Sequence, residues 1–196
     1  MDPLEAASRA GFIPERSKEA FVAWLTKSGN QHAILPHPDE QRLQGDIYRQ
    51  FPFALVKDDH QASIALKVIL VLNNTCDLQL NRTPSCNVAL AADYNCYAES
   101  IRAARSDQSA TNFLADVERN RIDDLFFLQD CPTFPAGLVV FLNKISTVPT
   151  KLYERALKQG HRFASLSQHG FYHLLIKLNR FFARVETSDV SRLCAG

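Results

Sequence analysis

The feature that most constrains the fold is the longest apolar run of the sequence, residues 64–72, which reads "IALKVILVL". Lys67 is the one charge in this run, and the run stops abruptly at Asn73. A short apolar segment rich in β-branched residues is typical of a buried strand, and it is far too short to span a bilayer as a helix. We therefore expect a sheet in which residues 62–73 form one buried strand and residues 86–93 a second.

The composition is that of a globular protein and excludes several classes. Of 196 residues, 46% are hydrophobic and 22% are charged, and the net charge is +1, so no bulk field attracts a nucleic acid or a membrane. The N-terminus lacks the apolar stretch of a secretory signal, so we expect a cytoplasmic protein. Five widely spaced cysteines without a C-x-x-C pair argue against a disulfide framework and a structural zinc site. We expect no metal, no cofactor and no membrane partner, and the oligomeric state stays open.

The order of patterns predicts one α+β domain over residues 1–196, because the sequence contains no repeat, low-complexity tract or flexible linker. The proline-rich stretch before Phe53 is expected to be loop with only a short strand near Ile47. Residues 150–159 are compatible with a helical turn or an exposed edge. The predicted parts are a helical lead-in (1–40), strands (41–93 and 122–166), a helical insert (94–120) and a C-terminal helix (167–186).

Residues 73–77, Asn-Asn-Thr-Cys-Asp, are the first candidate site, and we call them the rim. In the simplest interpretation Asn73 and Asn74 begin a turn, Asp77 accepts hydrogen bonds from backbone amides, and Cys76 is a small core residue. A binding role for Thr75 and Asp77 is the main alternative, since polar groups at the end of a strand often bind ligands. A catalytic Cys76 is a third interpretation, although no base lies nearby in the sequence.

The C-terminal helix is the second candidate site. Its apolar residues recur every three or four positions, the strongest periodicity of the chain. On the side opposite Phe171 we expect one basic stripe that could bind phosphates or an acidic partner: His169, His173, Lys177, Arg180 and Arg184. The alternative is an ordinary solvated helix face, although the stripe contains no acidic residue before Glu186.

Other motifs give little support for an enzyme. His169 and His173 have the spacing of two zinc ligands, but Gly170 stands where a metalloprotease has glutamate, and no third ligand is evident. Gly45 is expected to make a tight turn and Asp46 to cap the strand that follows, a structural role. The sequence contains no phosphate-binding loop, dinucleotide fingerprint or nucleophile elbow.

The "GDI" turn at residues 45–47, an irregular stretch, and the strand "VILVLNN" followed by "TCD" form a suggestive order. Over residues 43–92 this order resembles that of PemK/MazF-like proteins, which are SH3-like barrels of bacterial toxin–antitoxin modules. It is also similar to a broader set of bacterial proteins that pair "GDI" with a "TCD"-type motif. The resemblance implies a small SH3-like β-barrel elaborated with helices, and a defence or toxin–antitoxin setting.

The chain departs from that family where catalysis is concerned. The ribonuclease toxins carry an arginine-proline pair before the second of these strands, and this chain has only Lys67 there. Cleavage would have to use Thr75 and Asp77 with an arginine from elsewhere, either Arg82 or Arg162. A metal-independent endoribonuclease is therefore our alternative function.

Our first expectation is an accessory protein that binds a partner protein or a nucleic acid through the rim and the C-terminal helix. The residues expected to bind in this way are Asn74, Arg82, His169, His173, Lys177, Arg180 and Arg184.

Overall fold

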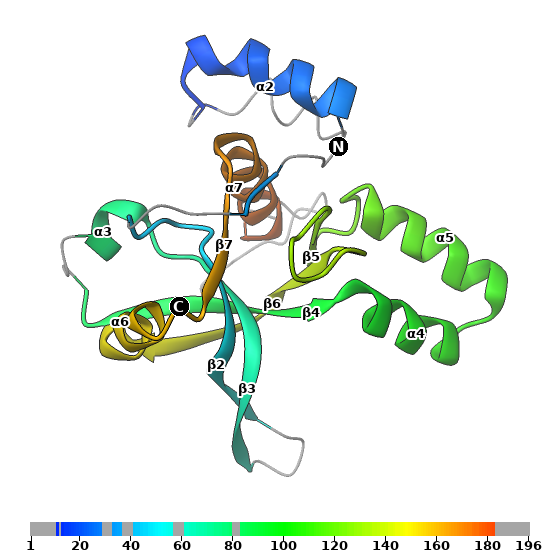
Figure 1. Ribbon diagram of the computed structural model, residues 1–196. Helices are drawn as coiled ribbons and strands as arrows, with labels where there is room; N and C mark the ends of the chain where they lie inside the picture. Colours follow the sequence, from blue (N-terminus) through cyan, green and yellow to red (C-terminus); the bar gives the residue numbers. More distant parts are fainter. Residues whose placement is uncertain are drawn as a thin grey trace, which may run out of the picture.

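The computed structural model describes residues 11, 13–28, 33–36, 41–56, 61–79 and 83–182. Within these residues the chain forms seven strands and six helices, so the expected α+β class is confirmed (Figure 1). The strands are β1 (Ile34–Leu35), β2 (Ile47–Val56), β3 (Ala62–Val71), β4 (Ser85–Asp93), β5 (Leu125–Leu128), β6 (Leu138–Pro149) and β7 (Arg162–Leu166). The helices are α2 (Glu15–Ser28), α3 (Thr75–Gln79), α4 (Tyr94–Ala104), α5 (Asp107–Glu118), α6 (Thr150–Lys158) and α7 (Gln168–Phe182).

The strands form one antiparallel sheet in the order β1-β7-β2-β3-β4-β6-β5. Its end strands, β1 and β5, do not pair with each other, so the described strands do not close into a barrel. Strand β2 is longer than the expected short strand near Ile47, because it continues through Pro52. Pro52 is tolerated there because a proline lacks only the N–H donor. At that position β2 has no neighbouring strand except β3, so its other edge needs no donor.

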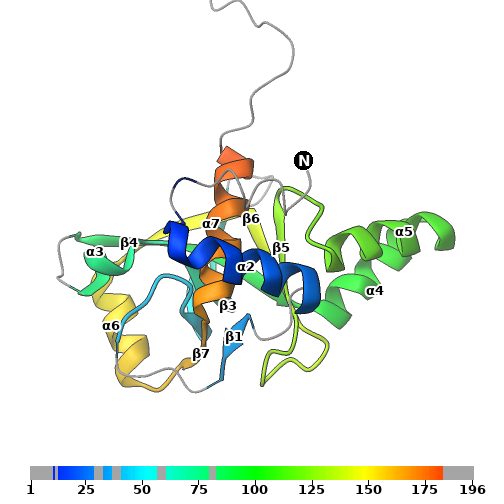
Figure 2. The ribbon, with the colours of Figure 1, turned by 90° about the horizontal axis from the view of Figure 1, so that it is seen from above.

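The larger core lies between the sheet and the helices α2 and α7. Figures 1 and 2 show α2 lying against α7, which in turn covers the sheet. Phe21 and Trp24 of α2, Leu174 of α7 and Leu70 of β3 are buried in this one core. Gly170 allows α7 to approach closely, because a Cβ at this position would overlap the backbone carbonyl of Ala33.

A second core lies around β2, β3 and α6. Phe51 and Phe53 of β2 pack with Val71 of β3 and with Tyr153 of α6, and Leu78 of α3 joins them. Residues 150–158 are therefore a helix rather than an exposed edge, because their apolar side chains cover this part of the sheet.

Helices α4 and α5 form a pair that projects to one side of the sheet (Figures 1 and 2). Tyr94 and Leu114 pack against Phe127 in a third, smaller core. Asn120, which has a positive φ of 55°, ends the pair, and its side-chain amide binds both backbone polar groups of Phe127. None of the described helices has the length and apolar character that a membrane crossing requires.

Candidate functional site

The turn before β2 places one carboxylate inside the protein. Gly45 has a φ of 91°, and its N–H donates to the Val71 carbonyl at 2.9 Å. The Val71 N–H donates to the Asp46 carbonyl at 2.9 Å, and the Leu166 N–H donates to the Gly45 carbonyl at 3.2 Å. The turn is thus held by β3 on one side and by β7 on the other, and the Asp46 side chain is buried.

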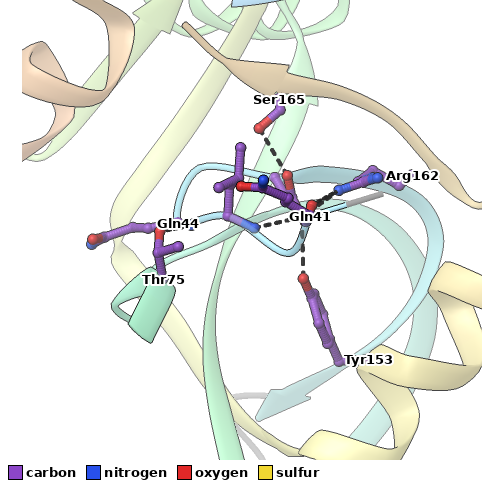
Figure 3. A network of polar contacts seen from close by, with 8 residues as sticks. Gln41, Gln44, Thr75, Tyr153, Arg162 and Ser165 are labelled. Carbon is purple, nitrogen blue, oxygen red and sulfur yellow. Dashed lines mark hydrogen bonds and ion pairs between the residues drawn. The ribbon is translucent and has the colours of Figure 1, made fainter. Parts of the chain in front are cut away.

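The Asp46 carboxylate has no solvent exposure and accepts four hydrogen bonds (Figure 3). Oδ1 accepts from the Ser165 hydroxyl at 2.8 Å. Oδ2 accepts from the Tyr153 hydroxyl at 3.1 Å, from Arg162 Nη1 at 3.1 Å and from the Leu43 N–H at 3.2 Å. The arginine makes the contact an ion pair, so a buried charge is matched by a cation and three further donors. We call these five residues the Asp46 cluster.

The cluster fixes which groups donate and which accept. Burial raises the pKa of Asp46, while the Arg162 guanidinium and the Ser165 hydroxyl act in the opposite direction. Burial, and next the nearby Asp46 carboxylate, raise the pKa of Tyr153. The Tyr153 hydroxyl therefore keeps its proton at neutral pH and donates it to the carboxylate.

Residues 41–46 connect the Asp46 cluster to the rim (Figure 3). At one end Arg162 Nη1 also donates to the Gln41 carbonyl. At the other end the Gln44 N–H donates to Thr75 Oγ1 at 3.0 Å, and Gln44 Nε2 donates to the Leu72 carbonyl at 2.7 Å. The loop thus binds the strand end before the rim and the first residue of α3.

Arg42 adds a third attachment of this loop. Its Nη1 lies 3.2 Å from the Leu78 carbonyl of α3 and 3.3 Å from Glu154 Oε1 of α6. Loop, α3 and α6 are therefore linked by one half-buried guanidinium.

The rim is the start of a short helix and not only a turn. The Asn74 side chain accepts from the Cys76 N–H at 3.1 Å, and the Asn74 backbone carbonyl accepts from the Asp77 N–H at 3.1 Å. The Asn73 side chain accepts from the backbone of Asn87 in β4. The asparagines therefore make the backbone contacts that we expected of Asp77, which is half-buried in the first turn of α3. Cys76 is exposed, so its assignment to the core was wrong.

The structure attaches Thr75 and Arg162, two of the three predicted catalytic residues, to opposite ends of the same loop. Both side chains already make structural contacts. The Thr75 hydroxyl accepts a hydrogen bond from a backbone N–H, and the Arg162 side chain is only 7% exposed in its ion pair with Asp46. Arg82, the alternative cation, lies outside the described residues. The contacts of Asp46 with Arg162 and with Tyr153 were missed, and the sequence signal for them was the "GDI" turn itself.

The expected basic stripe of α7 is not a solvent-facing surface, because His173 and Lys177 are buried and Arg180 is partly buried in an ion pair. Lys177 is 1% exposed, and its ammonium donates to the carbonyls of Asn120 at 3.2 Å and of Ile122. Arg180 pairs with Asp123 at 2.8 Å. The side of α7 opposite its apolar stripe thus binds the segment between α5 and β5.

The two histidines of the stripe belong to an aromatic cluster. His169 stacks on Trp24 with ring centroids 5.2 Å apart, and His173 meets the ring of Phe126 edge-on at 5.3 Å. Burial, and next the charge of Lys177, lower the pKa of His173 to about 3, so this imidazole is neutral at physiological pH. Arg184 lies outside the described residues, and within them no three His, Cys, Asp or Glu side chains are placed to hold a metal ion.

Replacing Asp46 with alanine should lower the free energy of unfolding by about 3–5 kcal/mol, because Arg162 would stay buried without its counter-ion. Asp77→Ala is the control, and we expect a change within about 0.5 kcal/mol because that carboxylate takes part in no described hydrogen bond or ion pair. Urea unfolding followed by circular dichroism measures both. Equal effects of the two substitutions would contradict the importance of the buried ion pair.

Lys177 predicts a specific dependence of stability on pH. Burial, and next the charge of Arg180, lower its pKa from 10.5 to about 8, so the unfolded chain binds this proton more tightly than the folded protein. Deprotonation of Lys177 therefore stabilises the folded protein. This contribution to the free energy of unfolding is complete above the unfolded pKa and is lost as the pH falls through the folded pKa. Between pH 8 and 10.5 the free energy of unfolding of the natural protein, minus that of Lys177→Met, should therefore rise by about 3 kcal/mol at most. Denaturant unfolding at several pH values measures this difference, and a flat or falling difference would contradict the lowered pKa of the buried Lys177.

A comparison of the sequence with protein-family models found no match, and neither did a comparison with curated proteins. The resemblance to PemK/MazF-like proteins therefore stays a prediction that rests on the short motifs of residues 43–92.

Proposed function

We propose that the protein is an interaction protein that binds a partner protein through the rim. The observation that carries the proposal is the anchoring of the rim by the loop 41–46, which bonds to Leu72 before it and to Thr75 within it. The same loop is fixed at its other end by the buried pair of Asp46 and Arg162. The exposed groups of Asn74 and Cys76 are thus presented from a backbone that is already ordered.

An ordered surface favours binding, because little conformational entropy is lost when a partner docks. The rim offers amide, hydroxyl and thiol groups and one carboxylate, and it contains no cation. A nucleic acid backbone would be repelled by Asp77 and would find no positive charge in the rim, whereas a protein can supply matching donors or a basic side chain. A partner protein is therefore favoured over a nucleic acid.

The fold and the setting are proposed from the resemblance. We propose that the sheet is an elaborated form of an SH3-like barrel, and that the protein acts in a bacterial defence or toxin–antitoxin system. Irregular strand pairing supports the proposed relation to a barrel. Strand β2 changes register against β3 between Tyr48 and Phe51, and β4 changes register against β6 between Ala89 and Leu90. Such bulges bend strands in the way that small barrels require.

The endoribonuclease alternative receives less support from the same contacts. Metal-independent cleavage needs a base for the 2′-hydroxyl and a cation for the charge that develops on phosphorus. Arg162 would have to leave the Asp46 carboxylate and the Gln41 carbonyl to serve as that cation. Its present contacts are those of a structural residue.

Asp77→Arg should abolish capture of the partner, because it reverses the one charge of the rim. The matched control is Glu99→Arg, which reverses an exposed carboxylate on α4. Tagged proteins would be purified from the native host with and without nuclease treatment, and bound proteins quantified by mass spectrometry. We expect a protein that survives nuclease, is retained by Glu99→Arg and is lost from Asp77→Arg.

Two results would contradict the proposal. The first is a partner that Asp77→Arg retains in full, which would place its binding elsewhere on the molecule. The second is RNA with defined new ends that the purified protein produces in the presence of a chelator, which would favour the ribonuclease alternative.

A further inference from the structure

Strands β2 and β3 extend beyond the rest of the sheet as a hairpin, which we call the arm (Figure 1). Strand β7 pairs with β2 only at Ile47 and Tyr48, and β4 pairs with β3 only over residues 68–71. The arm therefore consists of residues 51–56 of β2 and 62–67 of β3, which pair with each other.

The two faces of the arm differ. Phe51 and Phe53 point to one face and are buried in the core that α6 covers. The other face carries Ile64 and Leu66, which are 77% and 67% exposed and lie opposite Ala54 and Pro52. Large apolar side chains so exposed and adjacent are typical of an interaction surface.

The two edges of the arm also differ. The Val71 N–H and carbonyl bond toward β2, whereas the Leu72 N–H bonds toward β4. Because these directions alternate along a strand, the even-numbered residues 62, 64 and 66 direct their N–H and carbonyl groups to the outer edge of β3. On β2 the outward residues include Pro52, which has no N–H and blocks that edge. The outer edge of β3 is thus the one that can accept another strand.

We propose that this edge pairs with the same edge of a second copy of the chain, antiparallel and about a twofold axis at Ile64. In this register Ala62 faces Leu66 of the other copy, and Ile64 faces Ile64. It is the one twofold register in which the three outward residues pair only among themselves, without using Val68, which β4 already binds. The exposed apolar side chains of both copies then lie side by side on one face.

The charge pattern agrees with self-association. Lys67 is the only charged residue among residues 62–67, and in this register it faces Gln61 of the other copy. No like charges oppose each other, so the edge is complementary to itself, as an interface between identical copies requires. This inference is independent of the proposed function, because the rim lies on α3 and takes no part in the arm.

Analytical ultracentrifugation of the full chain tests the association. We expect a concentration-dependent dimer, and Ile64→Lys should raise its dissociation constant at least about tenfold by placing two ammonium groups on the axis. Ile145→Lys, which changes an exposed isoleucine of β6, should leave the dimer unchanged. Circular dichroism checks that both variants are folded. A natural protein that stays monomeric at every concentration, or an Ile64→Lys variant that dimerises normally, would overturn the proposal.

Disulfide cross-linking tests the register. Ser63 and Ala65 of the two copies would face each other as a non-hydrogen-bonded pair, with Cα atoms about 4.5 Å apart, within disulfide range. Ser63→Cys and Ala65→Cys would be made in a chain whose exposed or undescribed cysteines, Cys76, Cys96 and Cys194, are serine. A mixture of the two variants should form a mixed disulfide, whereas each alone should not. A disulfide that Ala65→Cys forms with itself would overturn the register.

The two proposals can fail separately. If the protein dimerises but Asp77→Arg loses no captured partner, only the role of the rim is contradicted. A monomer whose rim still captures a protein would contradict only the pairing of the arms.

Discussion

The buried carboxylate of Asp46 is the constraint on which the rest of the structure depends. A charge removed from water is tolerated only when donors surround it, and three of its four donors come from side chains of α6 and β7. Those residues lie more than 100 positions further along the chain. The carboxylate therefore requires that the C-terminal third of the chain meet the turn before β2. Once β7 is beside β2, α7 follows directly and covers the sheet.

The same constraint connects stability to function. Arg162 holds the loop 41–46 at one end, and Gln44 transmits that order to Thr75 at the other. A surface at the end of a strand would otherwise fray, since a five-residue helix such as α3 has no stability of its own. The arm needs no such support, because Phe51 and Phe53 fix one of its faces in the core. The protein thus offers two separate surfaces, one polar and one apolar, on a single scaffold.

Local patterns of the sequence predicted much of the fold but little of the site. The apolar run before Asn73 and the periodicity of α7 were sufficient to place a strand and a helix, because these signals depend on neighbouring residues. The prediction that Lys177 faces solvent was wrong. A helical projection assumes that one side of the helix is covered, whereas α7 is covered on two sides. The length of β2 was missed because Pro52 ends a strand only where its N–H would be needed. The Asp46 cluster depends on contacts across the whole chain, which no local pattern contains.

Amide hydrogen exchange in Asp46→Asn tests the central claim most directly. The substitution keeps the shape of the side chain and removes its charge. We predict that the amides of Gly45, Val71 and Leu166, which hold the turn, lose protection together with that of Gln44, which bonds to the rim. Loss of protection at Leu43 alone, with the other amides unchanged, would show that the carboxylate is a local cap and would contradict the account.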